Sequence, residues 1–562
     1  MSPTNETLVG YVVDVRGDGL TSNLLADEQE STPKVTVGDE DILVGQLGSY
    51  ISVQQGPIKI LCLVTRITEQ EKLADANAAS PDAPVITYAQ RTISLIPIGT
   101  VTSEGQFERG VSTYPTTGAE VHVVSAPELA ILFSKFQEQG YEVGGLSSQP
   151  SVKVHLDPSR LFGRHFAILG QTGAGKSWTV ASLIQQALLV MPKAHIIILD
   201  LHGEYCWLED DGTRNAAFKD EHFRYVDAKE LEMPYWLMTY AELCDLLIDH
   251  TEREAANQTA FFRDTLFDLK QAEKIPLGLG RVTVDTPVYF SLDELVNRVD
   301  GENKRMVPGT GKDKQGPMYG QFDRFLIRLT SKLNDVRYDF LLKPTKRTTS
   351  ASLAALLRDF VGLGEPKRPV TVIDLSTVPF DVRPTVAAQI GRLAFEFNYW
   401  NPQYREFPLL LVCEEAHAYV TRDQDSHYAG ARKSMERIAK EGRKYGVGLA
   451  VVSQRPHELS ETVLAQCGTF ICLRITNPDD QSYVKRLVPE AERGLVDILA
   501  GLGRGECLAL GEAVPLPTRF RFNRPNPVPN SEDIDFYNKW KDGPDDINVE
   551  AIVDRWRRQQ RS

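Results

Sequence analysis

Short hydrophobic segments that alternate with polar turns fill the first part of the chain. These segments, at 10–17, 50–68, 91–101 and 119–125, are rich in Val, Ile and Leu and are bounded by Gly, Pro and Asp. Repeated short strands with turn residues between them are typical of a small barrel or sandwich. We therefore predict an N-terminal β-barrel domain over 1–148.

The hydrophobic pattern changes near residue 149, where apolar runs begin to alternate with helical segments. An uninterrupted apolar run is typical of a strand buried on both faces of a parallel sheet. The alternation of such strands with helices indicates an α/β domain. The runs lie at 165–170, 194–201, 368–375, 408–415, 447–454 and 469–475.

A long stretch rich in helix formers separates the second of these runs from the third. The strand pattern resumes after it, so we predict a helical insertion over 207–365 between two parts of one core, 149–206 and 366–522. The end of the chain, 523–562, opens with a proline-rich stretch followed by an amphipathic helical pattern. We interpret this end as a linker and tail, whose basic tip is either a docking arm or a solvated terminus.

Composition supports a multidomain globular protein. A chain of 562 residues is too long for one hydrophobic core. At 42% hydrophobic and 25% charged residues it differs from both disordered and membrane-embedded chains. The first residues lack a basic, apolar signal pattern, so the cytoplasm is the expected location. The seven scattered cysteines form no C-x-x-C pair and are predicted to be reduced core residues.

The formal net charge of -14 bears on any nucleic-acid hypothesis. Contacts to phosphate need Lys or Arg, which this acidic chain does not supply in excess. A ring-shaped protein can nevertheless line only its channel with positive groups while its outside stays acidic. The charge therefore does not exclude binding to a nucleic acid.

The clearest chemical signal is the motif G-x-x-x-x-G-K-S, which lies between an apolar strand and a helical pattern. In this context glycines let backbone N–H groups wrap phosphate, the lysine reaches the β and γ phosphates, and the serine holds the metal. The sequence thus predicts a site for ATP and Mg²⁺. Its expected nucleotide-binding residues are Gly170, Gln171, Thr172, Gly173, Ala174, Gly175, Lys176, Ser177 and Trp178.

Hydrolysis needs further acidic groups at the end of another strand, and the run 408–415 ends in two of them. By position, Glu414 takes the metal role usually held by aspartate, and Glu415 is the candidate general base. Ser177 completes the metal site on the loop side. Asp200 ends the strand that precedes the insertion and is a further candidate metal ligand.

Three more side chains are candidates for catalysis. Gln454 ends the next strand, where an amide either senses the γ phosphate or merely caps the following segment. Arg164 and Arg443 each precede a strand. Charge that develops on the γ phosphate favours an arginine, supplied by the same chain or by a neighbour. Either arginine could also be only a solvated surface residue.

Six segments of the chain form a characteristic series: "RHFAILGQTGAGKS", "LDLHGEY", "CEEAHAYV", "EGRKYGVGLAVVSQRPHELSETVLAQCGTF", "LRITNPDDQSYVKRLVPE" and "GLGRGECLALGEAVPLPTR". Together they resemble the HerA ATPases, a branch of the FtsK/HerA superfamily of P-loop motors. The resemblance covers nearly the whole chain.

The resemblance implies a RecA-like core behind a HAS-barrel-like domain, and a bracing C-terminal tail. It also implies a homohexamer that threads double-stranded DNA through its channel and uses ATP to translocate or unwind it. The implied partner is an effector protein docked on the barrel: a NurA-like nuclease, another nuclease or a sirtuin-like protein. Such pairs act in DNA end processing or in antiviral defence.

Carried over by residue, the resemblance gives Lys176 and Ser177 to the phosphate loop, Glu415 to catalysis and Gln454 to sensing. Arg164 and Arg443 correspond to arginines near the nucleotide and the subunit boundary. Which of the two acts in trans stays open. Glu414 departs from the family pattern, which generally has aspartate there, and this affects the expected hydrolysis rate more than nucleotide binding.

Two other functions compete with the motor. In the first, the hexamer is an ATP-gated scaffold that assembles a nuclease or NADase effector, and translocation is secondary. In the second, the chain is a conjugation or secretion ATPase of the same superfamily. The absence of an apolar run long enough to span a membrane disfavours this last function.

Overall fold

The computed structural model describes residues 7–25, 34–37, 40–73, 87–102, 107–209, 213–423, 429–531, 534–544 and 546–558. The chain divides into two compact units, which are described separately below. The first consists of Met1–Lys193, Glu415–His417 and Gly448–Glu532. The second consists of Ala194–Glu414, Ala418–Val447 and Asp533–Ser562.

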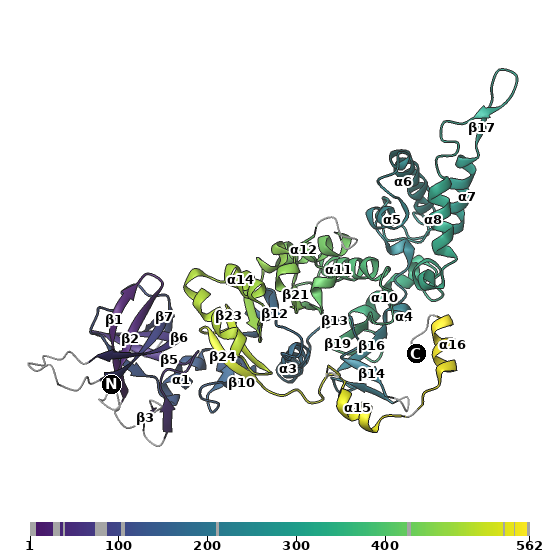
Figure 1. Ribbon diagram of the computed structural model, residues 1–562. Coiled ribbons are helices and arrows are strands. Elements are labelled where there is room, and N and C mark those ends of the chain that lie inside the picture. The colour runs from purple at the N-terminus through teal and green to yellow at the C-terminus, as the bar shows by residue number, and fades with distance from the viewer. Residues whose placement is uncertain are drawn as a thin grey trace, which may run out of the picture. The chain divides into compact units, whose positions relative to one another are not determined.

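A closed β-barrel begins the first unit, as predicted. Its strands follow the order β2-β1-β9-β5-β6-β7, and β2 pairs again with β7 to close the ring, while β8 adds to β7 at the edge. Alternate side chains point inward and form an aliphatic core. Figure 1 shows this barrel in purple and blue. The strands are β1 (Leu8–Arg16), β2 (Gly19–Leu24), β5 (Tyr50–Gln55), β6 (Ile58–Leu73), β7 (Thr87–Val101), β8 (Phe107–Arg109) and β9 (Glu120–Val123).

The rest of the first unit is a sheet flanked by helices. Its strands run in the order β11-β10-β24-β23-β22-β12-β21, and β12 lies parallel between β21 and β22. The strands are β10 (Glu142–Leu146), β11 (Lys153–His155), β12 (Phe166–Leu169), β21 (Val447–Ser453), β22 (Thr469–Cys472), β23 (Glu506–Gly511) and β24 (Thr518–Phe522). The main helices are α1 (Ala126–Phe133), α2 (Pro158–Gly163), α3 (Lys176–Val190) and α14 (Pro478–Leu487).

Polar contacts join the barrel to this sheet. The buried hydroxyl of Tyr50 donates to the carbonyl of Pro517 at 2.7 Å. On the sheet side, Arg519 Nη1 donates to the carbonyl of Leu47 at 2.8 Å. Both barrel residues lie at or next to β5, and both of their partners lie at or next to β24. The barrel is therefore anchored to β24 and the residue that precedes it.

The second unit contains a four-stranded parallel sheet in the order β20-β13-β19-β16. Three of these strands coincide with the apolar runs. The fourth, β16, lies inside the stretch predicted to be helical, and its side chains are mostly half-buried because it is an edge strand. The strands are β13 (Ile196–Asp200), β16 (Phe223–Asp227), β19 (Val370–Asp374) and β20 (Leu409–Cys413), and the packed helices are α11 (Arg383–Tyr399) and α12 (Ala429–Glu441).

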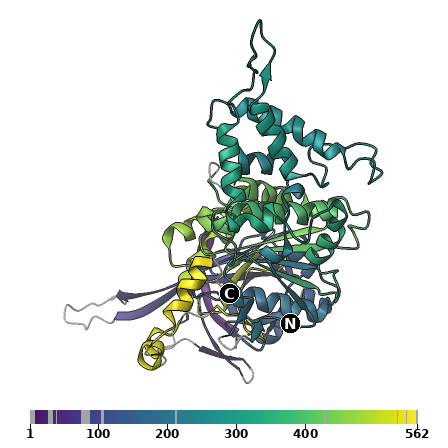
Figure 2. The same cartoon turned by 90° about the vertical axis from the view of Figure 1, so that its right-hand side faces the viewer.

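Helices dominate the rest of the insertion, and its hairpin β17–β18 projects beyond them (Figure 2). Buried Arg392 of α11 anchors the insertion through Glu242, whose two oxygens accept at 2.8 and 3.0 Å. The proposed boundary positions of the domains stay predictions. The elements are α5 (Tyr240–Leu247), α6 (Ala255–Gln271), α7 (Leu292–Asn303), β17 (Met306–Val307), β18 (Lys314–Gln315), α8 (Asp323–Leu333) and α10 (Leu353–Phe360), followed in the tail by α15 (Phe536–Asp542) and α16 (Val549–Arg558).

Two negative findings apply to the part of the chain that the structure describes. None of its helices combines the length and the apolar character needed to cross a bilayer. All seven cysteines lie within it as free thiols, and six of them are buried. The burial of these six agrees with the predicted core positions, and the reduced state of the cysteines stays a prediction.

Candidate ATP site

The loop that joins β12 to α3 has the geometry of a phosphate cradle. Because α3 begins at Lys176, the unsatisfied N–H groups of its first turn face the loop. Gly175 has φ 102°, in the left-handed region, and a Cβ at this position would lie 3.3 Å from the backbone nitrogen of Gly505. Only glycine fits there without strain. The second glycine of the motif is thus required by the fold as well as by phosphate.

Hydrogen bonds from neighbouring strands hold the loop in place. The N–H of Gly170 donates to the carbonyl of Ser453 at 3.2 Å, at the end of β21. The N–H of Gln171 donates to the carbonyl of Arg474 at 2.9 Å, and its side-chain oxygen accepts from the Thr476 hydroxyl at 2.6 Å. The loop conformation is therefore coupled to the segments that follow β21 and β22.

Glu415 faces the lysine of this loop. Its Oε1 lies 4.0 Å from Lys176 Nζ, and the two side chains are only 14% and 8% exposed. Glu415 also has φ 44°, a left-handed conformation that is unfavourable for a residue with a Cβ. Backbone strain of this kind is concentrated at functional sites. The structure therefore brings the predicted base next to the predicted phosphate-binding lysine.

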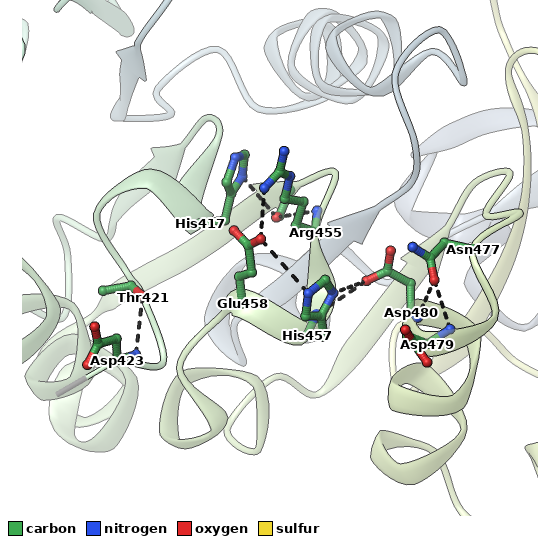
Figure 3. Close-up of polar contacts among 10 residues, drawn as sticks. His417, Thr421, Asp423, Arg455, His457, Glu458, Asn477, Asp479 and Asp480 are labelled. Atoms are coloured by element: carbon green, nitrogen blue, oxygen red, sulfur yellow. Dashed lines mark hydrogen bonds and ion pairs between the residues drawn. The ribbon is translucent and has the colours of Figure 1, made fainter. Parts of the chain in front are cut away.

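His417 links Glu415 to the end of β21. Its Nδ1 lies 3.2 Å from Glu415 Oε2 and 3.3 Å from the Ser453 hydroxyl, which in turn accepts from the N–H of Arg455 at 3.0 Å. Figure 3 shows His417 beside Arg455. The sequence analysis did not single out His417, although its spacing from Glu415 in "EEAH" is the signal that could have done so.

Gln454 contacts the phosphate loop directly. Its Oε1 accepts a hydrogen bond from Thr172 Oγ1 at 2.5 Å. The amide thus lies immediately after β21, where it can respond to a change in the loop. Its role as a sensor stays a prediction.

A second polar cluster follows Gln454 (Figure 3). Arg455 Nη1 donates to Glu458 at 2.8 Å, and His457 Nδ1 lies 2.7 Å from Asp480 Oδ1 on α14. Asn477 caps the same helix with its side-chain oxygen. These contacts fix the segment after β21 onto α14, so the end of that strand is held from both sides.

In the second unit, the carboxylate of Asp200 holds the loop that follows β13. Its two oxygens accept from the N–H groups of Gly203 at 2.8 Å and Tyr205 at 2.9 Å, among others. Burial raises the pKa of Asp200 to about 7, although the hydrogen bond from Tyr205 opposes this change. A metal role would require some of these bonds to be exchanged, and it stays a prediction.

Glu414 is buried in the same unit and already has partners. Its Oε1 accepts from the hydroxyl of Tyr205, and its carbonyl accepts from Tyr419 at 2.9 Å. In the described part of the chain, no group of three or more His, Cys, Asp or Glu side chains is arranged to hold a metal ion. Mg²⁺ is usually held by one or two protein groups together with phosphates. The assignment of Ser177, Glu414 and Asp200 as its ligands stays a prediction.

The two candidate arginines lie in different units, each shortly before a strand. Arg164 precedes β12 and forms an ion pair with Glu512. The four residues of β12 separate it from the loop by roughly 13 Å, since a strand rises about 3.3 Å per residue. Arg443 is exposed in the turn before β21. Arg164 is thus remote from the phosphate loop of its own chain, and the catalytic role of both arginines stays a prediction.

A glycine-rich loop between a buried parallel strand and a helix, with a glutamate opposite its lysine, defines a P-loop ATPase. The family "Helicase HerA, central domain" matches residues 141–394. The HerA DNA double-strand break repair helicase of Pyrococcus furiosus is 29% identical, over 76% of this chain and 76% of its own length. The corresponding helicase of Sulfolobus acidocaldarius is 27% identical, over 91% and 95%. The chain is thus similar to HerA helicases over most of its length, and it is an ATP hydrolase.

Among solved structures, VirB4 of Thermoanaerobacter pseudethanolicus is similar with a TM-score of 0.45 and 18% identity. The match covers 68% of this chain and 96% of that one. The plasmid coupling protein TrwB, solved with a non-hydrolysable ATP analogue, has a TM-score of 0.43 at 12% identity, over 71% and 93%.

Proposed function

We propose that this chain is an ATP-driven motor that moves along double-stranded DNA as a homohexameric ring. The observation that carries the proposal is the approach of Glu415 to Lys176 at 4.0 Å, beside a phosphate loop that Thr172 ties to Gln454. This arrangement unites phosphate binding, a base and a group that can report the state of the nucleotide.

In the proposed mechanism, the N–H groups of the loop bind the α and β phosphates of ATP, and Lys176 reaches the β and γ phosphates. Ser177, with Glu414 acting through water, would hold Mg²⁺, which neutralises charge on the phosphates when bound. Glu415 accepts a proton from the attacking water. Loss of the γ phosphate releases Lys176 and alters the loop. Thr172 of the loop passes this change to Gln454, which directly follows β21.

The position of Arg164 supports assembly of several copies. Arg164 lies at the opposite end of β12 from its own phosphate loop, so it would act on ATP only at the site of a neighbouring subunit. A closed ring satisfies this need at every site, since head-to-tail contacts repeat until the ring closes. Determining the mass of the assembled protein in solution, with and without ATP, tests the ring.

Double-stranded DNA is the proposed track. The similar HerA proteins of Pyrococcus furiosus and Sulfolobus acidocaldarius are named as DNA double-strand break repair helicases, and the latter match spans most of both chains. We further propose a cytoplasmic location and an effector, such as a nuclease or a sirtuin-like protein, that docks on the barrel. DNA end processing and antiviral defence are both compatible with such a pair.

The experiment that tests the motor is the ATP turnover of the full chain with and without linear duplex DNA. We expect DNA to raise turnover by about fivefold or more, the usual minimum for coupled sites. Lys176→Ala is the control and should abolish turnover under both conditions. If the turnover rate is the same with and without DNA but changes when a nuclease or NADase effector is added, the ATP-gated scaffold is the better account of the function.

A further inference from the structure

Trp178 projects from the first turn of α3, on the side away from Glu415. It follows Lys176 by two positions, and residues two apart in an α-helix point in nearly opposite directions. Lys176 faces Glu415, which marks the γ-phosphate side. The loop N–H groups cradle the α and β phosphates, so the sugar and base of a bound nucleotide extend away from that side. The indole of Trp178 is half-buried, and its place on α3 opposite Lys176 puts it on the side where we expect the sugar and base.

A turn from a distant part of the chain places one arginine on this indole. The N–H of Gly505 donates to the carbonyl of Ala174 at 3.1 Å, which docks the turn 503–506 directly on the phosphate loop. Gly505 has φ 75°, which permits this tight turn. The guanidinium carbon of Arg504 consequently lies 4.4 Å from the centre of the Trp178 ring.

A second arginine reaches the indole from the segment that follows β24, residues 523–527, which we call the C-terminal strap. Ser182, one turn after Trp178 on α3, donates to the carbonyl of Asn523 at 2.8 Å. Gln185, a further turn along, donates to the carbonyl of Pro527 at 2.7 Å. The strap therefore follows one face of α3 and brings Arg524 to 5.2 Å from the same ring.

Both arginines are exposed while the indole between the loop and the strap is half-buried. Their guanidinium planes and the indole are flat, polarisable surfaces on which a nucleobase can stack. Replacing such a stacking residue with alanine typically lowers the affinity by severalfold to over a hundredfold. Two positive charges next to the cradle also favour a polyanionic ligand over a neutral one.

We propose that Trp178, Arg504 and Arg524 form the subsite for the base of ATP, and that it sets the affinity for the nucleotide. The inference rests on the proposed ATP site and adds base recognition to it. Arg504 and Arg524 act as planar stacking groups, and the strap is the element that positions one of them. Base binding thus depends on the C-terminal part of the first unit as well as on the phosphate loop.

The test compares two probes on the full-length protein: ATP and inorganic tripolyphosphate, which has the phosphates but no base. Trp178→Ala should weaken ATP binding by about tenfold or more and leave tripolyphosphate binding within about threefold. Arg504→Ala should likewise weaken the binding of ATP more than the binding of tripolyphosphate. The thermal unfolding midpoint of each variant checks that it is folded.

Trp178→Phe supplies an independent readout because it keeps an aromatic face and removes the indole. It should bind fluorescent N-methylanthraniloyl-ATP within about threefold of wild type but lose most of the energy transfer from tryptophan. Trp400→Phe, which removes an exposed indole after α11, is the matched control and should keep that transfer.

Equal weakening of ATP and tripolyphosphate in Trp178→Ala and Arg504→Ala would overturn the base subsite, because these residues would then only support the loop. Unchanged ATP binding in both variants would overturn it too. If wild-type protein bound neither probe, the ATP site itself would fail together with this inference. Loss of tripolyphosphate binding in Lys176→Ala tests the phosphate site alone. Retention of that binding in Trp178→Ala and Arg504→Ala then shows that an effect on ATP comes from the base subsite.

Discussion

The two sides of α3 at its first turn differ in both charge and burial. On the Lys176 side, Glu415 and His417 are largely buried and acidic or titratable. On the Trp178 side, the surrounding groups are exposed arginines. The same helix turn therefore separates a confined region suited to proton transfer from an open region suited to stacking.

This difference indicates a division of labour. A base must be held within hydrogen-bond reach of the water it deprotonates, which requires rigid neighbours such as His417 and the strained backbone of Glu415. A stacking surface must let the nucleotide enter and leave, which exposed side chains permit. Changes on the first side should alter turnover, whereas changes on the second should alter affinity.

The largest effect is expected for Glu415→Gln, which keeps the shape of the side chain but removes its basicity. Turnover should fall by about 10²–10⁴-fold, the usual contribution of a general base. ATP binding should persist, so the variant should retain nucleotide in a filter-binding or gel-filtration measurement. A fully active variant would remove Glu415 from catalysis.

A smaller effect is expected for His417→Ala. Loss of the contact between His417 and the Glu415 carboxylate leaves that carboxylate less well oriented, and a hydrogen bond to a charged group contributes about tenfold. Steady-state kinetics should show the loss in kcat, with KM nearly unchanged.

His457→Ala is the matched control for this prediction, because His457 contacts Asp480 in the cluster after β21. It should alter kcat less than His417→Ala does. If the two variants were equally impaired, His417 would act only through the general stability of the region.

The smallest effect is expected for Glu414→Asp. The shorter side chain withdraws from the Tyr205 hydroxyl, so the free energy of unfolding should drop by about 1 kcal/mol. Turnover should stay within about threefold of wild type or rise, because aspartate is the usual residue at such a site. Tyr205→Phe should reproduce the stability loss in a chemical denaturation measurement, and an intact stability would argue against the contact.

The sequence predicted the parts of the fold whose residues are uniformly buried. The runs that became β12, β13, β19, β20, β21 and β22 are continuous apolar stretches, which have one simple interpretation. The barrel was predictable for a different reason, because Gly, Pro and Asp mark the turns between its short strands. Edge strand β16 was missed because half of its surface faces away from the core and its apolar pattern is weak.

In the ATP site, the predictable residues are those adjacent in the chain to the motif or to the end of a buried strand. The sequence analysis included Trp178 among the nucleotide-binding residues, but it did not include Arg504 or Arg524, because no spacing relates them to the loop. Only the turn at Gly505 and the C-terminal strap bring them to the indole. His417 is close to Glu415 in sequence, yet its contact with Ser453 depends on the fold.

The most direct test of the account is one ATP titration that compares Glu415→Gln and Trp178→Ala with the wild-type chain. If the two sides of α3 have the proposed roles, Glu415→Gln should keep the dissociation constant for ATP within about threefold of the wild-type value. Trp178→Ala should raise that constant by about tenfold or more. Equal dissociation constants for the two variants would contradict the division between a chemical side and a base-binding side.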